Sequence, residues 1–245
     1  MPRATAPFDP TSDRPYRLSR SKIELFTQCP QCFYLDRRLK IGRPEGPSFT
    51  LNNAVDALLK KEFDVHRARG SRHPLHEAYG LDLVPLPHEK MDEWRDALRR
   101  GITFLHAPTN FLVTGGIDDV WVTPDGELVI VDYKATSTQK VITLDESYRS
   151  AYKRQMDIYQ WLFRQNGFRV SKTGYFVYCN GLTDREAFDA KLEFDIQLIP
   201  YEGDDSWIED ALLRARACLE APQPPKPRKD CAFCLYRAKV AQALG

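Results

Sequence analysis

The sequence predicts an α/β protein in which a central mixed β-sheet is flanked by helices. Apolar residues recur at helical spacing over residues 51–69 and 150–166, and hydrophobic strand-like segments cover residues 111–122 and 127–134. In addition, cysteine pairs near both ends of the chain predict a helical lobe in which the N- and C-terminal segments are stapled together.

The composition limits the classes of protein that fit this chain. With 245 residues, of which 42% are hydrophobic, the chain can build a large core. A net charge of +1 gives no overall basic field, so affinity for nucleic acid would require a local groove. No signal peptide or long apolar run is evident, which predicts a cytoplasmic protein with no membrane segment and with reduced cysteines.

The predicted elements suggest one main domain with two terminal extensions. Residues 1–16, rich in proline and polar residues, are expected to form a flexible tail, and residues 17–220 form the main domain. Residues 221–245 comprise a proline-rich linker and a cysteine segment that is expected to pack on residues 19–40. The predicted helices are 19–27, 30–39, 51–69, 88–100, 150–166 and 205–220, and the predicted strands are 111–122, 127–134, 172–180 and 191–199.

Two of the predicted strands form a β-hairpin, because Thr-Pro-Asp-Gly at residues 123–126 is typical of a turn. If the hairpin is centred on Asp125, Asp118 lies opposite Asp132. Side chains alternate along a strand, so Lys134 lies on the same face as Asp132, two residues along. Two carboxylates and one ammonium therefore converge at one end of an otherwise apolar hairpin.

This trio indicates a metal site. Opposing strand residues have Cβ atoms about 5 Å apart, and carboxylates this close repel each other unless a cation lies between them. Mg²⁺ or Mn²⁺ suits such ligands, and the lysine could orient or help deprotonate a water or neutralise charge on a phosphate. An exposed ion pair is the alternative, but both faces of the hairpin are largely apolar, which disfavours it. Asp119 is a rival ligand; the register places it on the opposite face, although a β-bulge would reverse that assignment.

The helix expected over residues 150–166 presents Gln155 and Tyr159 one turn apart on its inward face. Taken alone, Tyr159 is best interpreted as a core residue and Gln155 as a boundary residue. Beside the acid–acid–lysine hairpin, a functional role for both is favoured.

These motifs together resemble the PD-(D/E)xK nuclease superfamily, and within it the RecB-like branch. That branch includes the CRISPR-adaptation exonucleases and the nuclease domains of AddAB-type helicase complexes. The chain has its motifs in the same order: Gly-x-x-Asp at residues 115–118, Asp-x-Lys at 132–134 and Gln-x-x-x-Tyr at 155–159. The resemblance implies a restriction-endonuclease-like core, with residues 17–220 as the nuclease domain.

The resemblance also implies roles for individual residues. Asp118 and Asp132 would be metal ligands, and Lys134 would be the catalytic lysine. Gln155 and Tyr159 would organise the site or touch DNA.

A further metal ligand in this family usually comes from an N-terminal helix, often as the histidine of Gly-x-x-His-x-x-Leu. The comparable stretch here is residues 53–59, in which Asp56 occupies the histidine position. Two alternatives stay open, because Asp56 could be another oxygen ligand or a solvated side chain. His66, farther along the same helix, is a weaker candidate.

The cysteines form a second constellation. Cys29-x-x-Cys32 and Cys231-x-x-Cys234 can each hold one metal centre, and a shared centre would close a loop worth about 5 kcal/mol. Relatives in the RecB-like branch use four cysteines, one N-terminal and three C-terminal, for an iron–sulfur cluster. Here the division is two and two, which departs from that pattern, although four ligands remain. The resemblance favours an iron–sulfur cluster, with zinc as the alternative and no metal as the third possibility.

The function predicted from these features is that of a metal-dependent DNA nuclease, an exonuclease that hydrolyses phosphodiester bonds at single-stranded DNA ends. Possible partners are proteins of a DNA-processing complex. Two alternatives remain: a non-catalytic nucleic-acid-binding or scaffold subunit with a structural zinc or iron–sulfur centre, and a zinc-stapled protein whose paired acids are structural. Candidate basic contacts to DNA are Arg37, Arg38, Lys40, Arg149, Lys153 and Arg154.

Overall fold

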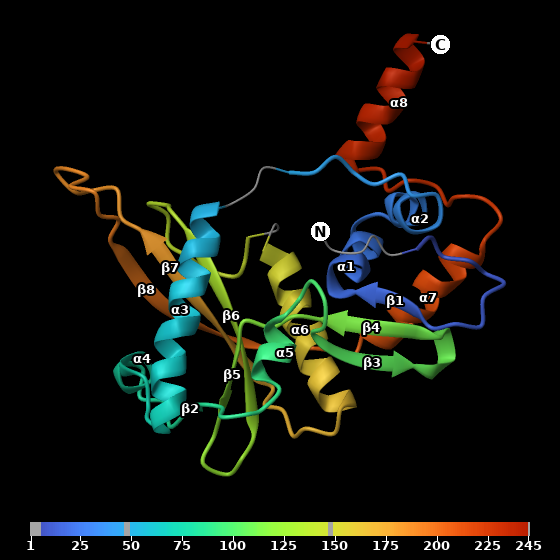
Figure 1. Ribbon diagram of the computed structural model, residues 1–245. Helices are drawn as coiled ribbons and strands as arrows, with labels where there is room; N and C mark the ends of the chain where they lie inside the picture. The colour runs from blue at the N-terminus through green and yellow to red at the C-terminus, as the bar shows by residue number, and fades with distance from the viewer. Residues whose placement is uncertain (1–5, 47–49, 147–148, 245) are drawn as a thin grey trace. The chain divides into compact units, whose positions relative to one another are not determined.

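The computed structural model describes residues 6–46, 50–146 and 149–244, which belong to two compact units (Figure 1). Unit 1 contains Met1–Pro47, Thr103–Thr114 and Ser206–Gly245, and unit 2 contains Ser48–Ile102 and Gly115–Asp205. The helices are α1 (Arg20–Gln28), α2 (Pro30–Arg38), α3 (Thr50–Arg69), α4 (Pro74–Ala78), α5 (Met91–Arg95), α6 (Ser150–Gln165), α7 (Ile208–Glu220) and α8 (Ala232–Leu244). The strands are β1 (Tyr16–Ser19), β2 (Val84–Pro85), β3 (Ile102–His106), β4 (Phe111–Gly115), β5 (Asp119–Val122), β6 (Leu128–Thr136), β7 (Thr173–Gly181) and β8 (Phe194–Glu202).

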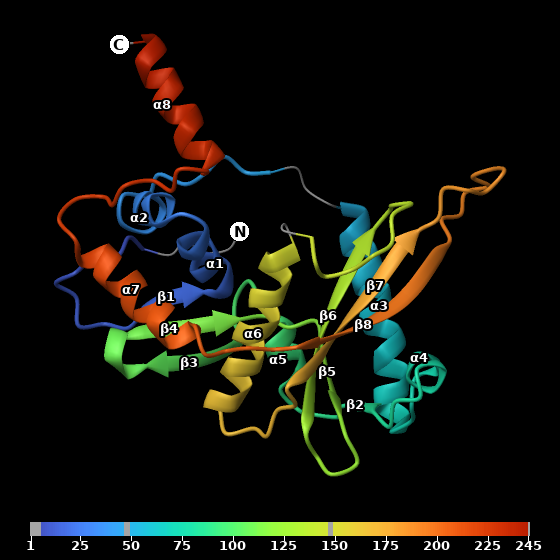
Figure 2. The ribbon, with the colours of Figure 1, turned by 180° about the vertical axis from the view of Figure 1, so that it is seen from behind.

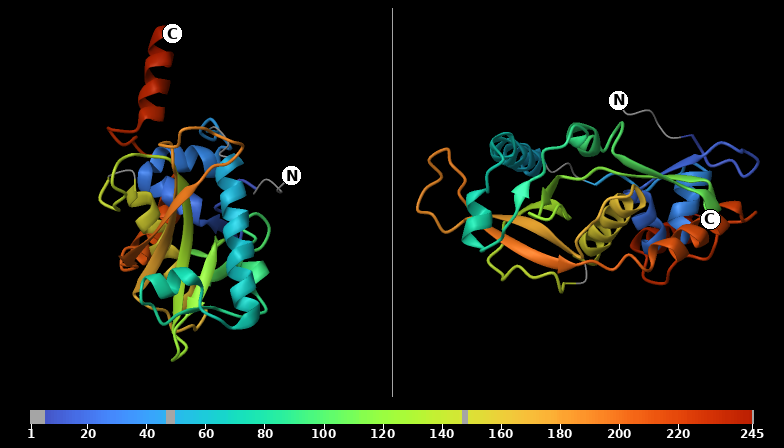
Figure 3. Two further views of the ribbon diagram at one scale, coloured as in Figure 1. Left: turned by 90° about the vertical axis from the view of Figure 1, so that its left-hand side faces the viewer. Right: turned by 90° about the horizontal axis from the view of Figure 1, so that it is seen from below.

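Unit 2 is built on a five-stranded mixed sheet in the order β2-β5-β6-β7-β8, in which β6 and β7 are parallel and the other neighbours are antiparallel. Helices α3 and α6 lie on opposite faces of this sheet (Figure 3). This arrangement confirms the predicted α/β fold class with a mixed sheet flanked by helices.

Each face of the sheet is covered because the hairpin strands are apolar on both sides. On the α3 face, Phe63 is fully buried and stacks with Trp121 and Tyr133 at ring-centroid distances of 5.3 and 5.7 Å. On the α6 face, helix packing is so close that a Cβ on Gly174 would lie 2.6 Å from the sulfur of Met156. The sheet is therefore a buried scaffold, and its polar residues stand out as exceptions.

The predicted hairpin register is confirmed. Val120 pairs with Ile130 and Asp119 with Val131, which is the pairing of a hairpin centred on Asp125. Gly126 has a φ of +82° and donates its N–H to the carbonyl of Thr123, as the turn requires.

The prediction of one strand over residues 111–122 is wrong, because β4 and β5 are separate strands in two different sheets. Between them, the N–H of Ile117 bonds to the carbonyl of Trp94 rather than to a neighbouring strand. The helix predicted over residues 88–100 is only α5. The five other predicted helices are present as α1, α2, α3, α6 and α7, whereas β1, β2, β3, α4 and α8 were not predicted.

Unit 1 combines α1, α2, α7 and α8 with the three-stranded sheet β1-β4-β3. Helix α7 packs against α1 and α2 (Figure 2). The segment expected to be a tail contributes Phe8, which is 4% exposed and donates its N–H to the carbonyl of Arg37, and Tyr16, which begins β1. Among the described residues, no helix has both the length and the apolar character needed to cross a bilayer.

Candidate active site

A pocket of about 310 Å³ lies in unit 2 where the first turns of α3 approach the end of β6. It is lined by Asn52, Asn53, Val55, Asp56, Leu59, Asp118, Tyr133, Lys134, Ala135 and Tyr152. Three of the residues predicted from sequence, Asp56, Asp118 and Lys134, therefore share one pocket. The structure brings them together from α3, from the segment before β5 and from β6.

The remaining predicted residues form a hydrogen-bonded chain directly behind Lys134. Lys134 forms an ion pair with Asp132, whose side chain is 1% exposed. The amide nitrogen of Gln155 donates to Asp132 Oδ1 (2.7 Å), and it lies 3.1 Å from the hydroxyl of Tyr159. The amide oxygen of Gln155 accepts from Lys134 at 3.5 Å. Gln155 of α6 therefore contacts both members of the Asp132–Lys134 ion pair.

Lys134 is held as an ammonium ion. Burial alone would lower its pKa, but the charges of Asp132 and Asp118 outweigh burial and raise the pKa above its usual value. The ammonium also lies 4.6 Å from the ring centroid of Tyr152. Such a group supplies positive charge and hydrogen bonds rather than a basic lone pair.

The sequence analysis did not identify Lys60, which links the two other acids of the pocket. Its ammonium lies 2.8 Å from Asp56 Oδ2 and 3.3 Å from Asp118 Oδ1. Burial and the charge of Asp118 raise the pKa of Asp56, while Lys60 opposes that rise. The signal in the sequence was the spacing of four residues between Asp56 and Lys60 on one helix face. All three acids therefore lie beside a lysine.

Asp118 is oriented by the backbone as well. Its Oδ2 accepts the N–H of Tyr133 at 2.9 Å, across the hairpin, so the carboxylate spans the space next to β6. The side chain is 23% exposed, which leaves it accessible from the pocket.

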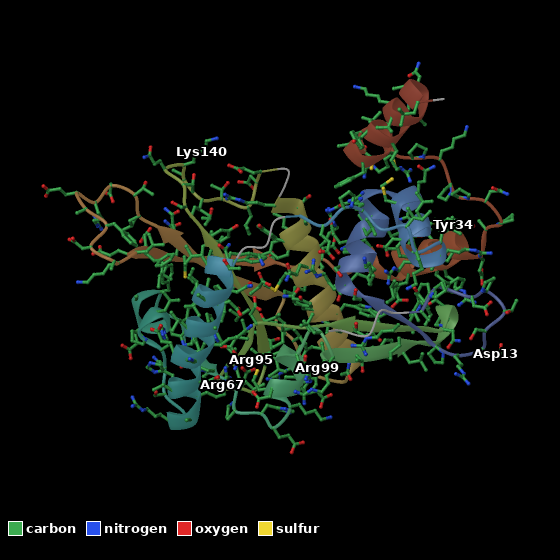
Figure 4. The ribbon with its side chains drawn as sticks, turned by 45° about the horizontal axis from the view of Figure 1, so that its top comes forward. Asp13, Tyr34, Arg67, Arg95, Arg99 and Lys140 are labelled. Atoms are coloured by element: carbon green, nitrogen blue, oxygen red, sulfur yellow. The ribbon has the colours of Figure 1, made fainter. Side chains whose placement is uncertain are left out.

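The side chain of Asp119, the rival ligand, lies on the other face of the sheet. It is fully buried, accepts from Arg67 and Arg95 and receives the hydroxyl of Tyr133 at 2.8 Å. The two arginines lie close together (Figure 4). Arg95 also donates to the backbone carbonyl of Asp118 at 3.0 Å, so the Asp119 network holds the segment that carries Asp118. Neither arginine was identified from the sequence.

Other candidates lie away from this pocket. His66 contacts Ser71 and His73 and does not line the pocket. Five of the six candidate basic residues have partners within the chain. Arg38 donates to the carbonyl of Leu219 and buried Arg149 to that of Thr143. The other three contact neighbouring side chains: Arg37 with Asp36, Lys153 with Asp145 and Arg154 with Ser150. These contacts weaken the case for the basic clusters as free phosphate contacts.

The four paired cysteines meet in unit 1. These cysteines are buried, and their sulfur atoms all lie within 4.8 Å of one another. Among the described residues, they form a group of side chains close enough together to bind one metal centre. Arg43 and Arg237 each place a guanidinium nitrogen 3.7 Å from a sulfur, that of Cys231 and that of Cys234 respectively. Thiolates in this arrangement suit a soft or borderline metal.

Comparison with known proteins identifies a family for this chain. A family model described as the PD-(D/E)XK nuclease superfamily matches residues 17–238. A solved structure titled "Crystal structure of SSO0001" is similar at 20% sequence identity and a TM-score of 0.31; the match covers 55% of this chain and 54%, about half, of that chain. No curated protein matches the chain.

Proposed function

Because the chain belongs to the PD-(D/E)XK nuclease superfamily, we propose that it is a metal-dependent DNA nuclease that hydrolyses phosphodiester bonds. The observation that carries this proposal is the convergence of Asp118, Asp132 and Lys134 at one end of the β5–β6 hairpin, beside an open pocket. Burial of an acid and a lysine at the end of a strand costs folding free energy, so their presence there favours a functional role.

The acids that line the pocket, and Asp132 behind it, carry the oxygen ligands that a hard divalent cation takes. Asp118 and Asp132 offer carboxylate oxygens, and Asp56 offers another from α3. Oxygen ligands of this kind suit Mg²⁺ or Mn²⁺, which would share the acids with the neighbouring lysine ammonium groups. When bound, the cation would polarise the scissile phosphate and favour ionisation of a water.

The other side chains around the pocket would stabilise charge on the phosphate and orient the metal ligands. Lys134, held by Asp132, Gln155 and the ring of Tyr152, presents its ammonium where negative charge would build on the phosphate. Gln155 fixes Asp132 from behind, and Tyr159 supports the Gln155 amide. The hydrogen bonds of Gln155 and Tyr159 therefore orient the groups that would touch the substrate or the metal ion.

We further propose that the enzyme belongs to the RecB-like branch and degrades single-stranded DNA from its ends, with protein partners in a DNA-processing complex. The order of the three motifs along the chain supports the branch. An end-dependent enzyme should degrade linear single strands and leave circular single strands intact. Equal cleavage of both would contradict the exonuclease proposal without affecting the metal-dependent nuclease.

The proposed active site is tested by Lys134→Ala. We expect Mn²⁺-dependent cleavage of DNA to fall by at least about 100-fold, because the charge that faces the phosphate is lost. The matched control is Lys140→Ala, which removes an exposed lysine from the loop after the same strand (Figure 4) and should keep full activity.

Folding of both variants is checked by thermal melting. Unchanged cleavage by a folded Lys134→Ala protein would refute the assignment of the site. If the wild-type protein binds no Mn²⁺ and cleaves no DNA, the non-catalytic nucleic-acid-binding subunit becomes the better explanation.

A further inference from the structure

We propose that Cys29, Cys32, Cys231 and Cys234 hold a single tetrahedral zinc ion, and not the iron–sulfur cluster that the family resemblance implies. This centre lies in unit 1 and does not depend on the proposed nuclease activity.

The separations of the sulfur atoms are those of a one-ion site. The sulfur of Cys32 lies 3.5 Å from that of Cys234 and 3.6 Å from that of Cys231, and the sulfurs of Cys29 and Cys234 are 3.7 Å apart. Four thiolates placed tetrahedrally around one zinc ion at about 2.3 Å are separated by about 3.8 Å. The three sulfur–sulfur separations given above lie within about 0.3 Å of this value.

An iron–sulfur cluster requires a wider cage. In a four-iron cluster each thiolate binds a different iron atom on the outside of the cube, which spreads the sulfurs to about 6 Å. In a two-iron cluster the thiolates on different irons are also separated by the width of the cluster. Since all four sulfurs here lie within 4.8 Å of one another, neither cluster fits between them.

The two cysteine pairs are built alike, as expected of two halves of one tetrahedral site. Cys29 directly precedes α2 and Cys231 directly precedes α8, and the second cysteine of each pair lies in the first turn of the helix. The carbonyl of Cys29 accepts the N–H of Phe33, and that of Cys231 accepts the N–H of Leu235. Each pair therefore places two sulfurs at the start of a helix, where a bound cation can hold them as thiolates at a common centre.

The charge around the sulfurs is consistent with zinc and four thiolates, while the sulfur separations distinguish zinc from a cluster. Such a centre carries a net charge of about −2, and the guanidinium groups of Arg43 and Arg237, each 3.7 Å from a sulfur, supply two compensating charges. Arg43 is held in place by the ring of Phe233, 4.5 Å from its guanidinium carbon. Among divalent ions that accept four thiolates, zinc binds more tightly than ferrous iron.

The proposal is tested on the full chain purified without oxygen, by elemental analysis, assay of acid-labile sulfide and visible absorption. We expect about one zinc ion per chain, no sulfide and no visible colour. A brown protein with iron and sulfide would overturn the proposal. So would one iron without sulfide, or no stoichiometric metal.

The ligand set is tested by Cys32→Ser, which should lose most of the bound zinc. Cys218→Ala is the matched control, because Cys218 lies on α7 outside the four-sulfur group, and it should retain the metal. Since Cys32→Ser could fail to fold, the wild-type protein is also loaded with Co²⁺ in place of zinc. Intense visible bands of tetrahedral cobalt–thiolate support the proposal, and the weak spectrum of octahedral cobalt contradicts it.

Discussion

At the residue scale, the candidate active site depends on which partner each buried polar group finds. Gln155 is 9% exposed and serves as a two-sided clamp, with its amide nitrogen on Asp132 and its oxygen toward Lys134. A buried carboxylate next to one lysine is fully satisfied only with such additional hydrogen bonds. The identity of the residue at position 155 therefore controls the geometry of both charged groups.

Replacing Gln155 by Ala should weaken the site without removing any charge. We expect apparent Mn²⁺ affinity or cleavage rate to fall by about 10- to 100-fold, which is the usual cost of losing a residue that orients a ligand. A Mn²⁺ titration of cleavage measures the change. The control is Gln165→Ala, at the exposed end of the same helix. Equal activity of both variants would show that Gln155 does not orient the site.

A second residue-scale prediction concerns His76 in the core on the α3 face. His76 is fully buried, its Nε2 has no hydrogen-bond partner, and burial together with His73 lowers its pKa to about 4. In the unfolded chain the pKa is near 6.5. Between these values the unfolded state binds more protons, so the free energy of unfolding decreases as the pH falls from 6.5 toward 4, by up to about 1.4 kcal/mol per pH unit.

Denaturant unfolding at pH 7 and pH 5 tests this expectation. The wild-type protein should lose about 1 to 2 kcal/mol more stability over this interval than His76→Gln. The same loss in both proteins would mean that His76 is already protonated, or solvated, in the folded state. His88→Gln, which changes a half-buried histidine elsewhere in unit 2, controls for the substitution itself.

At the scale of elements, the close approach of α6 to the end of β4 helps to place Gln155 beside Asp132. Gly115 lies where β4 ends, and a Cβ there would lie 2.8 Å from Tyr159 and 2.9 Å from Leu162. Its φ is not positive, so close approach of the helix is the reason for glycine at this position. The same side chain of Tyr159 supports Gln155.

Gly115→Val should therefore push α6 outward and disturb the site. We expect a loss of about 1 to 3 kcal/mol in the free energy of unfolding, together with a loss of Mn²⁺-dependent cleavage in protein that is still folded. Gly46→Ala is the control, because a Cβ at Gly46 meets nothing within 4 Å. A Gly115→Val protein with wild-type stability would show that α6 can move away freely.

At the scale of the whole molecule, the C-terminal cysteine pair lies beside the N-terminal cysteine pair. Cysteines 199 to 205 positions apart in sequence meet at the four sulfurs. Unit 1 therefore combines segments from both ends of the given sequence with the internal segment Thr103–Thr114, which carries most of β3 and β4. A bound ion would close this loop, and a cross-link over a loop of such length is worth about 5 kcal/mol in the chain-entropy description. The stability of unit 1 should then be linked to metal binding.

A zinc chelator tests this linkage. Hydrogen exchange should become faster in α1, α2 and α8 when the metal is removed, while α6 and β6 in unit 2 change little. Exchange that is unaffected in unit 1 would show that the cysteine centre contributes nothing to its stability. Equal acceleration in both units would show that the two unfold as one.

Local rules were sufficient to predict much of the fold and of the candidate site. The turn at residues 123–126 and the alternation of side chains correctly predicted the hairpin register and the opposite-face position of Asp119. Helical periodicity predicted α3 and α6, and the two Cys-x-x-Cys pairs predicted a meeting of the termini. These features depend on neighbours within a few residues, or on a spacing that is visible in the chain.

Only the tertiary structure decided the rest. The break between β4 and β5, the contacts of Lys60 with Asp118 and of Arg95 with Asp119, and the separation of the four sulfurs each depend on residues that are distant in sequence. Periodicity carries no information about such pairs, because a charged residue on a helix face looks the same whether it faces water or an acid on another element. Packing in three dimensions selects among those partners, and so decides which of the charged residues of this sequence contribute to the site.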